Sequence, residues 1–284
     1  MYTGNTINGL IDLPIYSVLI SLYSKERPDY LRLSLESIFH QSLPPNEVIL
    51  VEDGPLTDEL YAVLDEYECS YSQLKRIPLA INGGLGKALN EGLKHCSNEL
   101  VARMDSDDVC FPNRFEKQVK FMTENPDIDI SGTWIEEFEN DIENKVSIRK
   151  VPITHEEIAR YIGKRNPLNH PSVIFRKEAV LKAGSYQSFL LFEDWYLWAR
   201  MMVNGCRFAN IPECLLHFRT SLDVMSRRGG MKYAKSSFRF QKELHRLGLI
   251  SGFDAVKNGL MRGVVYLLPN RLRALVYSKL LRSK

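Results

Sequence analysis

Cysteine is scarce in this sequence of 284 residues, and its spacing excludes two structural roles. The number of cysteines is odd, no two form a C-x-x-C pair, and none is combined with histidines at zinc-site spacing. A disulfide framework and a structural zinc site are therefore excluded, and a reduced intracellular chain is expected. The five residues are Cys69, Cys96, Cys110, Cys206 and Cys214.

Long apolar runs are also missing. The opening segment MYTGNTINGLIDLP has neither the basic patch nor the apolar run of a signal peptide. No later stretch approaches the roughly 20 apolar residues that a spanning helix needs. We therefore expect a chain that is neither exported nor transmembrane. With 44% apolar and 25% charged residues, the composition is that of a globular protein and excludes disorder, collagen and coiled coil.

Charge is distributed unevenly along the chain. The formal net charge is only +2, but residues 1–218 carry −10 and residues 219–284 carry +12. Such a split indicates a basic appendage that faces an anionic surface, which could be nucleic acid, phospholipid or a phosphorylated substrate. No internal repeat or low-complexity segment accompanies it.

The first half alternates β-branched runs with amphipathic stretches, which is typical of βαβ units and a mostly parallel sheet. Expected strands there are 15–23, 47–53, 74–80 and 98–105. Expected helices are 28–39, 57–68, a helix opened by the glycine-rich turn within 82–96, and one from Pro112 to Asn125. The second half predicts strands at 128–138, 145–151, 172–176, 206–209 and 213–219, and helices at 154–163, 193–205 and from 228 onward, broken once at Pro269.

An acidic cluster follows the fourth strand. Asp105, Asp107 and Asp108 stand where an open α/β sheet binds ligands, beyond the carboxyl ends of its strands. Carboxylates this close repel one another unless a cation neutralises them, and oxygen ligands suit Mg²⁺ or Mn²⁺. The alternative is an Asx-rich turn that caps the next helix. Spacing alone does not decide between the two.

Two weaker motifs accompany the cluster. Asp53 ends the second expected strand, where a carboxylate could accept a hydrogen bond from a base imide or a ribose hydroxyl. The glycines of NGGLG, residues 82–86, let a ligand approach a helix N-terminus, where N–H groups favour phosphate. No GK[ST] follows, and the motif does not follow the first strand. It is therefore neither a Walker loop nor a dinucleotide fingerprint.

Taken in order, the segments VLISLYSKERPDYLRLSLESIFHQ, EVILVEDGP, NGGLGKALNEGL and ARMDSDD resemble the inverting family 2 glycosyltransferases of the GT-A fold. The resemblance spans about residues 15–220. In detail the chain is similar to the bacterial branch that builds O-antigen and exopolysaccharide repeat units, the amylovoran-type transferases. It implies a nucleotide-sugar-binding half at 1–110, an acceptor-binding half of the same domain at 111–220, and a basic helical extension at 221–284.

The resemblance implies roles for residues on the donor side. Tyr23 would stack on the uracil and Glu26 would border the ribose, while Asp53 would accept from the uracil imide. Asp105 and Asp107 match the DxD motif, and Asp107 is the expected direct metal ligand for Mn²⁺ or Mg²⁺. The further residues assigned to the nucleotide and diphosphate are Asn82, Gly84, Lys87 and Arg103.

The resemblance also implies roles on the acceptor side. Glu193 and Asp194 match the family's Glu-Asp pair, in which the aspartate is the general base that inversion requires. The indole rings of Trp195 and Trp198 could stack on a sugar. From the residues alone, Glu193 and Asp194 would merely begin a helix whose aromatic face is core. His170, within NPLNHPS at 166–172, is a candidate acceptor contact.

Arginines near residue 220 complete the expected site. Arg219, Arg227 and Arg228 could pair with diphosphate oxygens, since a guanidinium suits bidentate phosphate recognition. Related enzymes often place a metal-binding histidine just after the first of these arginines. Thr220 follows it here, and His217 is the possible substitute. The QxxRW signature of processive polymerases is absent, so one sugar per acceptor is expected.

The segment after Pro269 is predicted to be an amphipathic basic helix, with Leu272, Leu275, Val276 and Leu280 on one stripe. We expect it to meet the anionic inner face of the bacterial inner membrane. The resemblance implies that sugars linked through a diphosphate to undecaprenol are the acceptors and that a UDP-hexose is the donor. A helical cap on the core is the alternative.

Two other functions compete with the transfer of a sugar. A nucleotidyltransferase usually has a basic glycine-rich loop after the first strand, where this chain has LYSKERP. A nucleic-acid-binding protein could use the basic tail, but the acidic body would repel a phosphate backbone.

Overall fold

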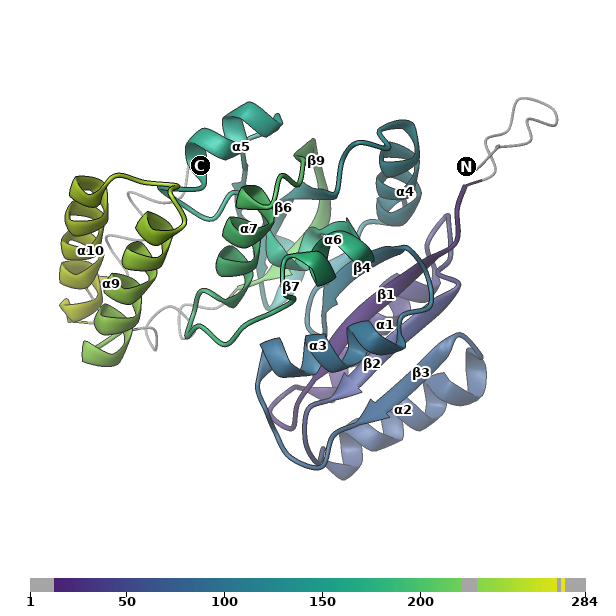
Figure 1. The fold of residues 1–284 in the computed structure, drawn as a ribbon. Coiled ribbons are helices and arrows are strands. Elements are labelled where there is room, and N and C mark those ends of the chain that lie inside the picture. Colours follow the sequence, from purple (N-terminus) through teal and green to yellow (C-terminus); the bar gives the residue numbers. More distant parts are fainter. Residues whose placement is uncertain (1–12, 221–228, 270–271, 274–284) are drawn as a thin grey trace.

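The structure is a computed structural model that describes residues 13–220, 229–269 and 272–273. One sheet of nine strands runs through the body (Figure 1). Its first part is parallel, in the order β3-β2-β1-β4. These strands are β1 (Tyr16–Leu22), β2 (Glu47–Glu52), β3 (Leu74–Pro78) and β4 (Leu100–Asp105). The parallel half expected from the sequence is therefore confirmed.

The second part of the sheet is mixed. The order continues as β8-β6-β9-β5, with β7 paired to β6. Only β6 and β9 are parallel in this part; the other pairs are antiparallel. The strands are β5 (Val109–Cys110), β6 (Ile130–Glu139), β7 (Asp141–Arg149), β8 (Ile174–Arg176) and β9 (Phe208–Arg219).

Side chains of the central strands alternate between two cores because successive residues of a strand point to opposite faces. On β1, Leu19 belongs to one core, and Val18 and Ile20 belong to the other. Every residue of β2 is buried, as expected for a parallel strand covered on both faces. The sheet is therefore a middle layer between two sets of helices.

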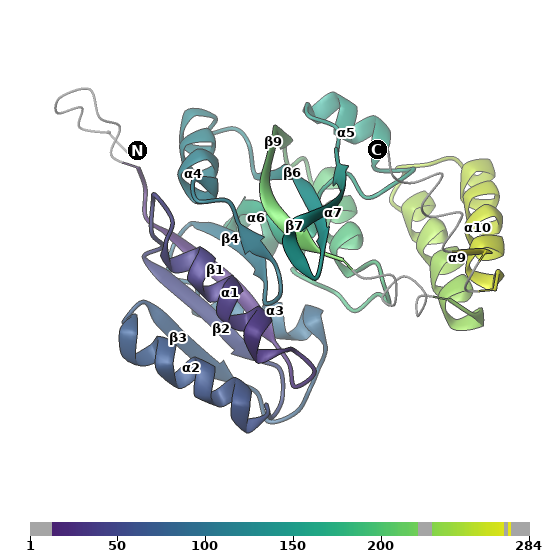
Figure 2. The ribbon, with the colours of Figure 1, turned by 180° about the vertical axis from the view of Figure 1, so that it is seen from behind.

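One core is covered by α1 (Pro28–Phe39), α2 (Asp58–Ser70) and α4 (Arg114–Glu124). The other is covered by α3 (Leu85–His95), α5 (His155–Tyr161), α6 (Lys177–Lys182) and α7 (Glu193–Val203). In Figure 1 α3 lies in front of the parallel strands, and in the view from behind α1 does (Figure 2). A short 3₁₀ helix, η1, spans His170–Ser172.

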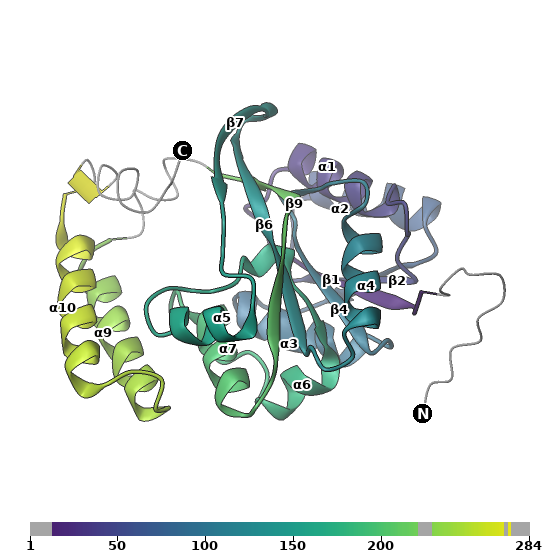
Figure 3. The ribbon, with the colours of Figure 1, turned by 90° about the horizontal axis from the view of Figure 1, so that it is seen from above.

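Two basic helices, α9 (Met231–Arg246) and α10 (Gly252–Leu267), form a hairpin at the end of the molecule away from β3 (Figures 1 and 3). The chain therefore breaks at 247–251 as well as near Pro269, which corrects the single break expected. Gly248, at a φ of +77°, occupies the left-handed conformation that ends a helix. Phe240 and Leu244 of α9 are buried in the same core as α7.

The expected strands at 206–209 and 213–219 are one strand, β9, and this corrects the prediction. Its pairing with β6 shifts register between Ile211 and Cys214, at Pro212 and Glu213. Proline lacks a backbone donor and is tolerated in a strand at such a bulge. Three short elements, β5, η1 and α6, were not expected.

All five cysteines are free. None of the helices in the part of the chain that the structure describes is both long enough and apolar enough to cross a membrane.

Candidate active site

The motifs selected from the sequence meet at the carboxyl edge of the parallel strands. Ser21 on β1 pairs with Asp105 on β4, and the Asp53 amide donates to the Leu22 carbonyl at 2.7 Å. Three consecutive positions in the sheet thus deliver their following loops to one place. The arrangement is the crevice at which open α/β sheets bind ligands.

Asp53 organises the glycine-rich turn. Its carboxylate accepts from the backbone N–H groups of Gly83, at 2.7 Å, and Gly84, at 3.0 Å. The Asn82 side-chain amide donates to the Asp53 carbonyl at 3.0 Å. Gly54 adopts a φ of +85°, and a Cβ there would lie 2.6 Å from the Asn82 nitrogen. This close approach requires glycine. The contact between Asp53 and a uracil imide stays a prediction, with the carboxylate only 3% exposed.

The other donor-side residues surround this turn. Gly84, at a φ of +86°, precedes the first turn of α3, and the exposed Lys87 lies one turn into that helix. Tyr23 is 44% exposed just beyond β1, as a base-stacking ring would need to be. Glu26 accepts from the Ser106 hydroxyl at 2.8 Å, which ties the loop after β1 to the acidic cluster.

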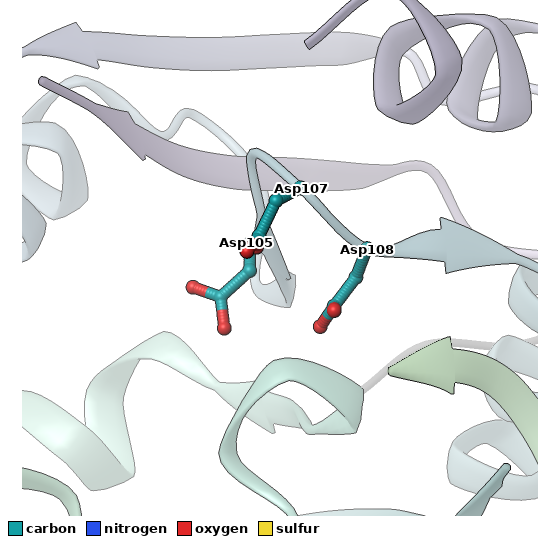
Figure 4. A group of neighbouring side chains, drawn as sticks. All are labelled: Asp105, Asp107 and Asp108. Carbon is teal, nitrogen blue, oxygen red and sulfur yellow. The ribbon is translucent and has the colours of Figure 1, made fainter. Parts of the chain in front are cut away.

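The acidic cluster is compact. Potential ligand atoms of Asp105, Asp107 and Asp108 all lie within 4.8 Å of one another, and Figure 4 shows Asp105 and Asp108 directing their carboxyl groups to the same side of the turn. Burial, followed by the charges of Asp105 and Glu26, raises the pKa of Asp107 to about 7. Burial and the two neighbouring aspartates also raise the pKa of Asp108. The cluster therefore concentrates more negative charge than the protein itself neutralises.

Arg103 provides one counter-charge. It is 1% exposed and forms an ion pair with Asp105 through Nη2. Its Nε and Nη1 atoms are buried without a hydrogen-bond partner in the described residues. A buried guanidinium with unsatisfied donors at the edge of a crevice is suited to bind an anionic group there.

The residues present fit a divalent cation. The donors are three carboxylates, which suit Mg²⁺ or Mn²⁺. Asp108 Oδ2 is buried without a partner among the described residues, while Oδ1 accepts from the Arg219 amide at 2.8 Å. A cation would satisfy this oxygen and relieve the repulsion that raises the pKa of Asp107 and Asp108.

Arg219 lies beside the cluster, and two of its guanidinium nitrogens have partners, while Nη2 is buried without one among the described residues. It donates to the carbonyl oxygens of Asp107, at 2.9 Å, and Asn140, at 2.8 Å. Its guanidinium carbon also lies 3.7 Å from the centre of the Tyr30 ring. The arginine therefore holds the acidic turn in place. Its contact with a diphosphate stays a prediction. Arg227 and Arg228 lie outside the described residues.

His217 does not join the acidic cluster in the part of the chain that the structure describes. Its ring stacks on Phe111 at 4.0 Å, and its Nδ1 lies 3.0 Å from Glu136 Oε1. The expected substitution of His217 for the family's metal-binding histidine is therefore not seen in this geometry.

Asp194 lies in the first turn of α7. Its Oδ2 accepts from the Asn166 side-chain amide at 2.6 Å, and its Oδ1 accepts from the Trp195 amide at 2.7 Å. Burial raises the pKa of Asp194, and these hydrogen bonds together with the charges of Arg149 and Arg103 oppose the rise only in part. A carboxylate with a raised pKa is a better proton acceptor than an ordinary one. Arg103 thus lies between the acidic cluster and Asp194.

Of the residues next to Asp194 in sequence, Glu193 lies near the site, and Trp195 and Trp198 lie in the core. The Glu193 side chain lies close to Gly86 of α3, at the edge of the crevice. Trp195 and Trp198 are buried in the core, and Trp195 donates to the Ile162 carbonyl at 2.8 Å. This burial corrects the expected sugar contact of both rings and matches the aromatic core face that we kept as the alternative.

In the acceptor-side loop, residues 166–172, the residue that contacts Asp194 is Asn166 and not His170, which was the candidate from the sequence. His170 Nε2 lies 3.0 Å from the Tyr186 hydroxyl, and burial lowers the pKa of His170. Asn166, from the same NPLNHPS segment, contacts Asp194 directly. Sequence reasoning selected the segment but not this residue. Arg149 was also missed, because only the folding of β7 against the 163–169 loop brings it to Asp194.

Comparisons with known proteins agree with this geometry. The family described as Glycosyl transferase family 2 matches residues 17–184. An Escherichia coli UDP-Gal:α-D-GlcNAc-diphosphoundecaprenol β-1,3-galactosyltransferase is 41% identical over 95% of this chain and 98% of its own length. The Erwinia amylovora amylovoran biosynthesis glycosyltransferase AmsE is 40% identical over 93% of this chain and 98% of its own.

Among solved structures, a fragment of S. aureus TarS in complex with UDP-GlcNAc superposes with a TM-score of 0.65 and 19% identity. The match covers 95% of this chain and 76% of the fragment, and it supports the GT-A fold expected from the sequence. The chain belongs to glycosyltransferase family 2. It therefore does not belong with the nucleotidyltransferases kept as an alternative.

Proposed function

We propose that this glycosyltransferase moves a single hexose, galactose or glucose, from a UDP-sugar to an acceptor of the GlcNAc- or GalNAc-diphospho-undecaprenol type, with inversion. The transfer would serve O-antigen or exopolysaccharide repeat-unit synthesis. One observation carries the proposal: the 41% identity to a galactosyltransferase named for this donor and acceptor extends over nearly the whole of both chains. A shared single domain alone would not imply a shared acceptor.

In the proposed mechanism, Asp194 removes the proton of the acceptor hydroxyl as its oxygen attacks the anomeric carbon. The Asn166 side-chain amide donates to one oxygen of the Asp194 carboxylate at 2.6 Å. The other oxygen accepts from the Trp195 amide at the N-terminus of α7. The two hydrogen bonds fix the orientation of the carboxylate. Burial raises the pKa of the Asp194 carboxyl group, so that the carboxylate accepts a proton at neutral pH more readily. Glu193, one residue earlier, would contact the acceptor.

On the donor side, the loop held by Asp53 would receive the uridine, with Tyr23 against the base and Glu26 near the ribose. Asp107, with Asp105 and Asp108, would hold the cation. When bound, Mn²⁺ or Mg²⁺ supplies positive charge against the leaving diphosphate. Arg103 would act on the same side, since its Nε and Nη1 donors, unpaired within the described residues, are buried next to Asp105.

The amphipathic helix expected after Pro269 lies, except for residues 272–273, outside the described residues. Within them, the C-terminal hairpin supports a membrane-surface role. Phe253, Val256, Leu260, Val264 and Leu267 recur at helical spacing on α10 and are all more than half exposed. Residues 229–269 carry seven lysines and arginines against two acidic residues. An apolar helix face with basic surroundings is typical of helices that lie in the interface of an anionic bilayer. We propose that this face seats the enzyme on the inner face of the inner membrane, where its acceptor is held.

The first test is a UDP-release assay. UDP-Glc, UDP-Gal, UDP-GlcNAc and UDP-GalNAc are each offered with a GlcNAc- or GalNAc-diphospho-lipid acceptor, with Mn²⁺ or Mg²⁺, and with an EDTA control. We expect release with UDP-Gal or UDP-Glc only, and its loss in EDTA. Transfer that persists in EDTA would refute the cation site. A chain that binds UDP but transfers to none of these acceptors would refute the acceptor class.

A further inference from the structure

Arg149, the last residue of β7, lies beside the carboxylate proposed as the base. Its Nη2 donates to the Asn166 carbonyl at 3.4 Å, and the Asn166 side chain donates to Asp194 at 2.6 Å. Asn166 therefore joins the two. Asn169 also donates to the Arg149 carbonyl, at 3.4 Å, which fixes the end of the strand against the acceptor-side loop.

The guanidinium of Arg149 has fewer hydrogen bonds among the described residues than those of Arg114, Arg200 and Arg219. Arg114, Arg200 and Arg219 each donate two or more hydrogen bonds to backbone carbonyl oxygens. Within the described residues, the Arg149 guanidinium donates one hydrogen bond, of 3.4 Å, and no carboxylate there lies within ion-pair distance of it. A guanidinium has five N–H donors, so most of its capacity is available to a ligand.

The surroundings of Arg149 favour an anion. Burial lowers the pKa of Arg149, Arg165 lowers it further by like charge, and Asp194 and Glu137 oppose both. The side chain keeps partial exposure, so that a ligand can reach it. The positive charge of Arg165 thus acts on Arg149, and a phosphate group bound at Arg149 would offset this repulsion.

A groove begins at Val151, two residues after Arg149 in the sequence. Its volume is about 400 Å³, and it runs between the segment 151–153 and α5. Arg160 and Lys164 line it on the α5 side, together with Tyr161 and Glu157. Arg262 of α10 donates to the Lys164 carbonyl at 2.7 Å, so the groove lies next to the hairpin with the exposed apolar face.

We propose that Arg149 binds the diphosphate of the acceptor, and that the groove lined by Arg160 and Lys164 leads the lipid-linked end away from Asp194 toward α10. The inference rests on the proposed function, because it assumes an acceptor sugar that carries a diphosphate. The diphosphate and the reacting hydroxyl are then separated by one sugar ring, as Arg149 and Asp194 are separated by Asn166. Arg219, assigned to a diphosphate from the sequence, donates through Nε and Nη1 to the carbonyl oxygens of Asp107 and Asn140.

The test compares the binding of two probes to the full chain in the presence of saturating UDP. One probe is a soluble N-acetylglucosaminyl diphosphoryl alkyl ester, and the other is the uncharged N-acetylglucosaminyl alkyl glycoside. We expect R149Q to weaken binding of the diphosphoryl ester at least about tenfold, the size of a lost charge-assisted hydrogen bond. Binding of the glycoside should stay unchanged. R149K keeps the positive charge but loses the planar guanidinium that can donate two parallel hydrogen bonds to a phosphate. Its affinity for the diphosphoryl ester should therefore lie between those of the unmodified chain and R149Q.

The matched control is K150Q, which removes the same charge from the adjacent residue. The Lys150 ammonium lies 5.0 Å from the Trp134 ring centre, outside the proposed site. K150Q should bind both probes like the unmodified chain. Unchanged UDP binding in every variant verifies that it is folded.

Equal weakening for both probes, or no weakening for the diphosphoryl ester, would overturn the assignment of Arg149. Because the assay measures binding, an effect of Arg149 on the proton affinity of Asp194 would not imitate the expected result. Failure of the proposed function looks different: the unmodified chain would then transfer no sugar from any UDP donor, whatever the Arg149 variants bind.

Discussion

Asp194 is the residue on which the proposed transfer depends most directly. D194N keeps the shape of the side chain and removes its capacity to accept a proton. Transfer should fall by at least about a hundredfold, the usual contribution of a general base, whereas UDP binding should be retained. UDP release and equilibrium UDP binding, measured on the same preparation, check both parts. Retained turnover would remove Asp194 from the mechanism.

The pH profile of the unmodified chain, measured with Mn²⁺ or Mg²⁺ at saturation so that Asp107 stays ionised, gives a second readout of Asp194. The pKa of Asp194 is raised by burial, and the base acts only when deprotonated. Activity should therefore be present above the raised pKa and decline as the pH falls through it. The acid limb should lie above the ordinary aspartate value of about 3.9. A limb at or below that value would contradict the burial of the base.

At the scale of elements, α3 is fixed to the sheet by Gly92. A Cβ at this position would lie 2.6 Å from Val51 Cγ2 and also meet Leu19 Cδ1. Both are branched side chains of buried central strands. G92A should therefore lower the free energy of unfolding by about 1–3 kcal/mol through overpacking, despite the better helix propensity of alanine.

Urea unfolding checks this expectation, and α10 offers a matched control. Gly263 lies inside that helix, and a Cβ added there would meet no neighbouring side chain of the described residues within 4 Å. G263A should leave stability unchanged or raise it by up to about 1 kcal/mol. If G92A were as stable as G263A, α3 would pack less closely on β1 and β2 than the structure indicates.

Elements that are determined by local sequence patterns were predicted well, and elements that depend on contacts with distant strands were not. Strands β1, β2 and β4 and helix α3 were predicted closely, because periodicity and turn residues are local. Strand β9 was divided at Pro212, since a proline normally ends a strand and only its partner β6 shows that pairing resumes. The break between α9 and α10 is marked by Gly248 and by Ser251, whose hydroxyl accepts from the Asp254 amide and caps α10; both lie within an otherwise helical pattern.

Site residues were likewise predicted where they belong to a local motif and missed where the fold brings them together. Asp105, Asp107 and Asp194 stand in motifs that are continuous in sequence, so a resemblance was enough to select them. Asn166 and Arg149 acquire their positions only when β7 and the 163–169 loop pack beside α7. The aromatic residues after Asp194 look alike in sequence whether they face a sugar or a core. Packing against Phe240 places Trp195 in the core.

At the scale of the whole molecule, attachment to a bilayer should depend on the outer face of α10. Replacing Leu260 and Val264 together with serine removes exposed apolar surface without touching the buried contacts of α9. The fraction that sediments with vesicles of anionic phospholipid should fall. It should fall for the unmodified chain too when salt is raised to weaken the electrostatic part.

The control replaces an apolar residue of similar exposure on a distant helix, Leu33 of α1, with serine. Its sedimentation should match that of the unmodified chain. Equal sedimentation of the α10 variant would place membrane contact elsewhere or exclude it. A truncation before α9 is a poorer test, because it also removes Phe240, whose ring stacks on Phe192 at 4.5 Å.

The stacking of Phe192 on Phe240 links the position of Asp194 to that of α10. Phe192 directly precedes α7 and Asp194, and Phe240 belongs to the helix paired with α10. With α10 seated on a bilayer, the base stands at a set height above the lipid surface. An acceptor sugar joined to the lipid by its diphosphate would reach that height, and the hexose added to it would stand one ring higher. The packing of two phenylalanines would then act as a ruler that ends the reaction after one addition.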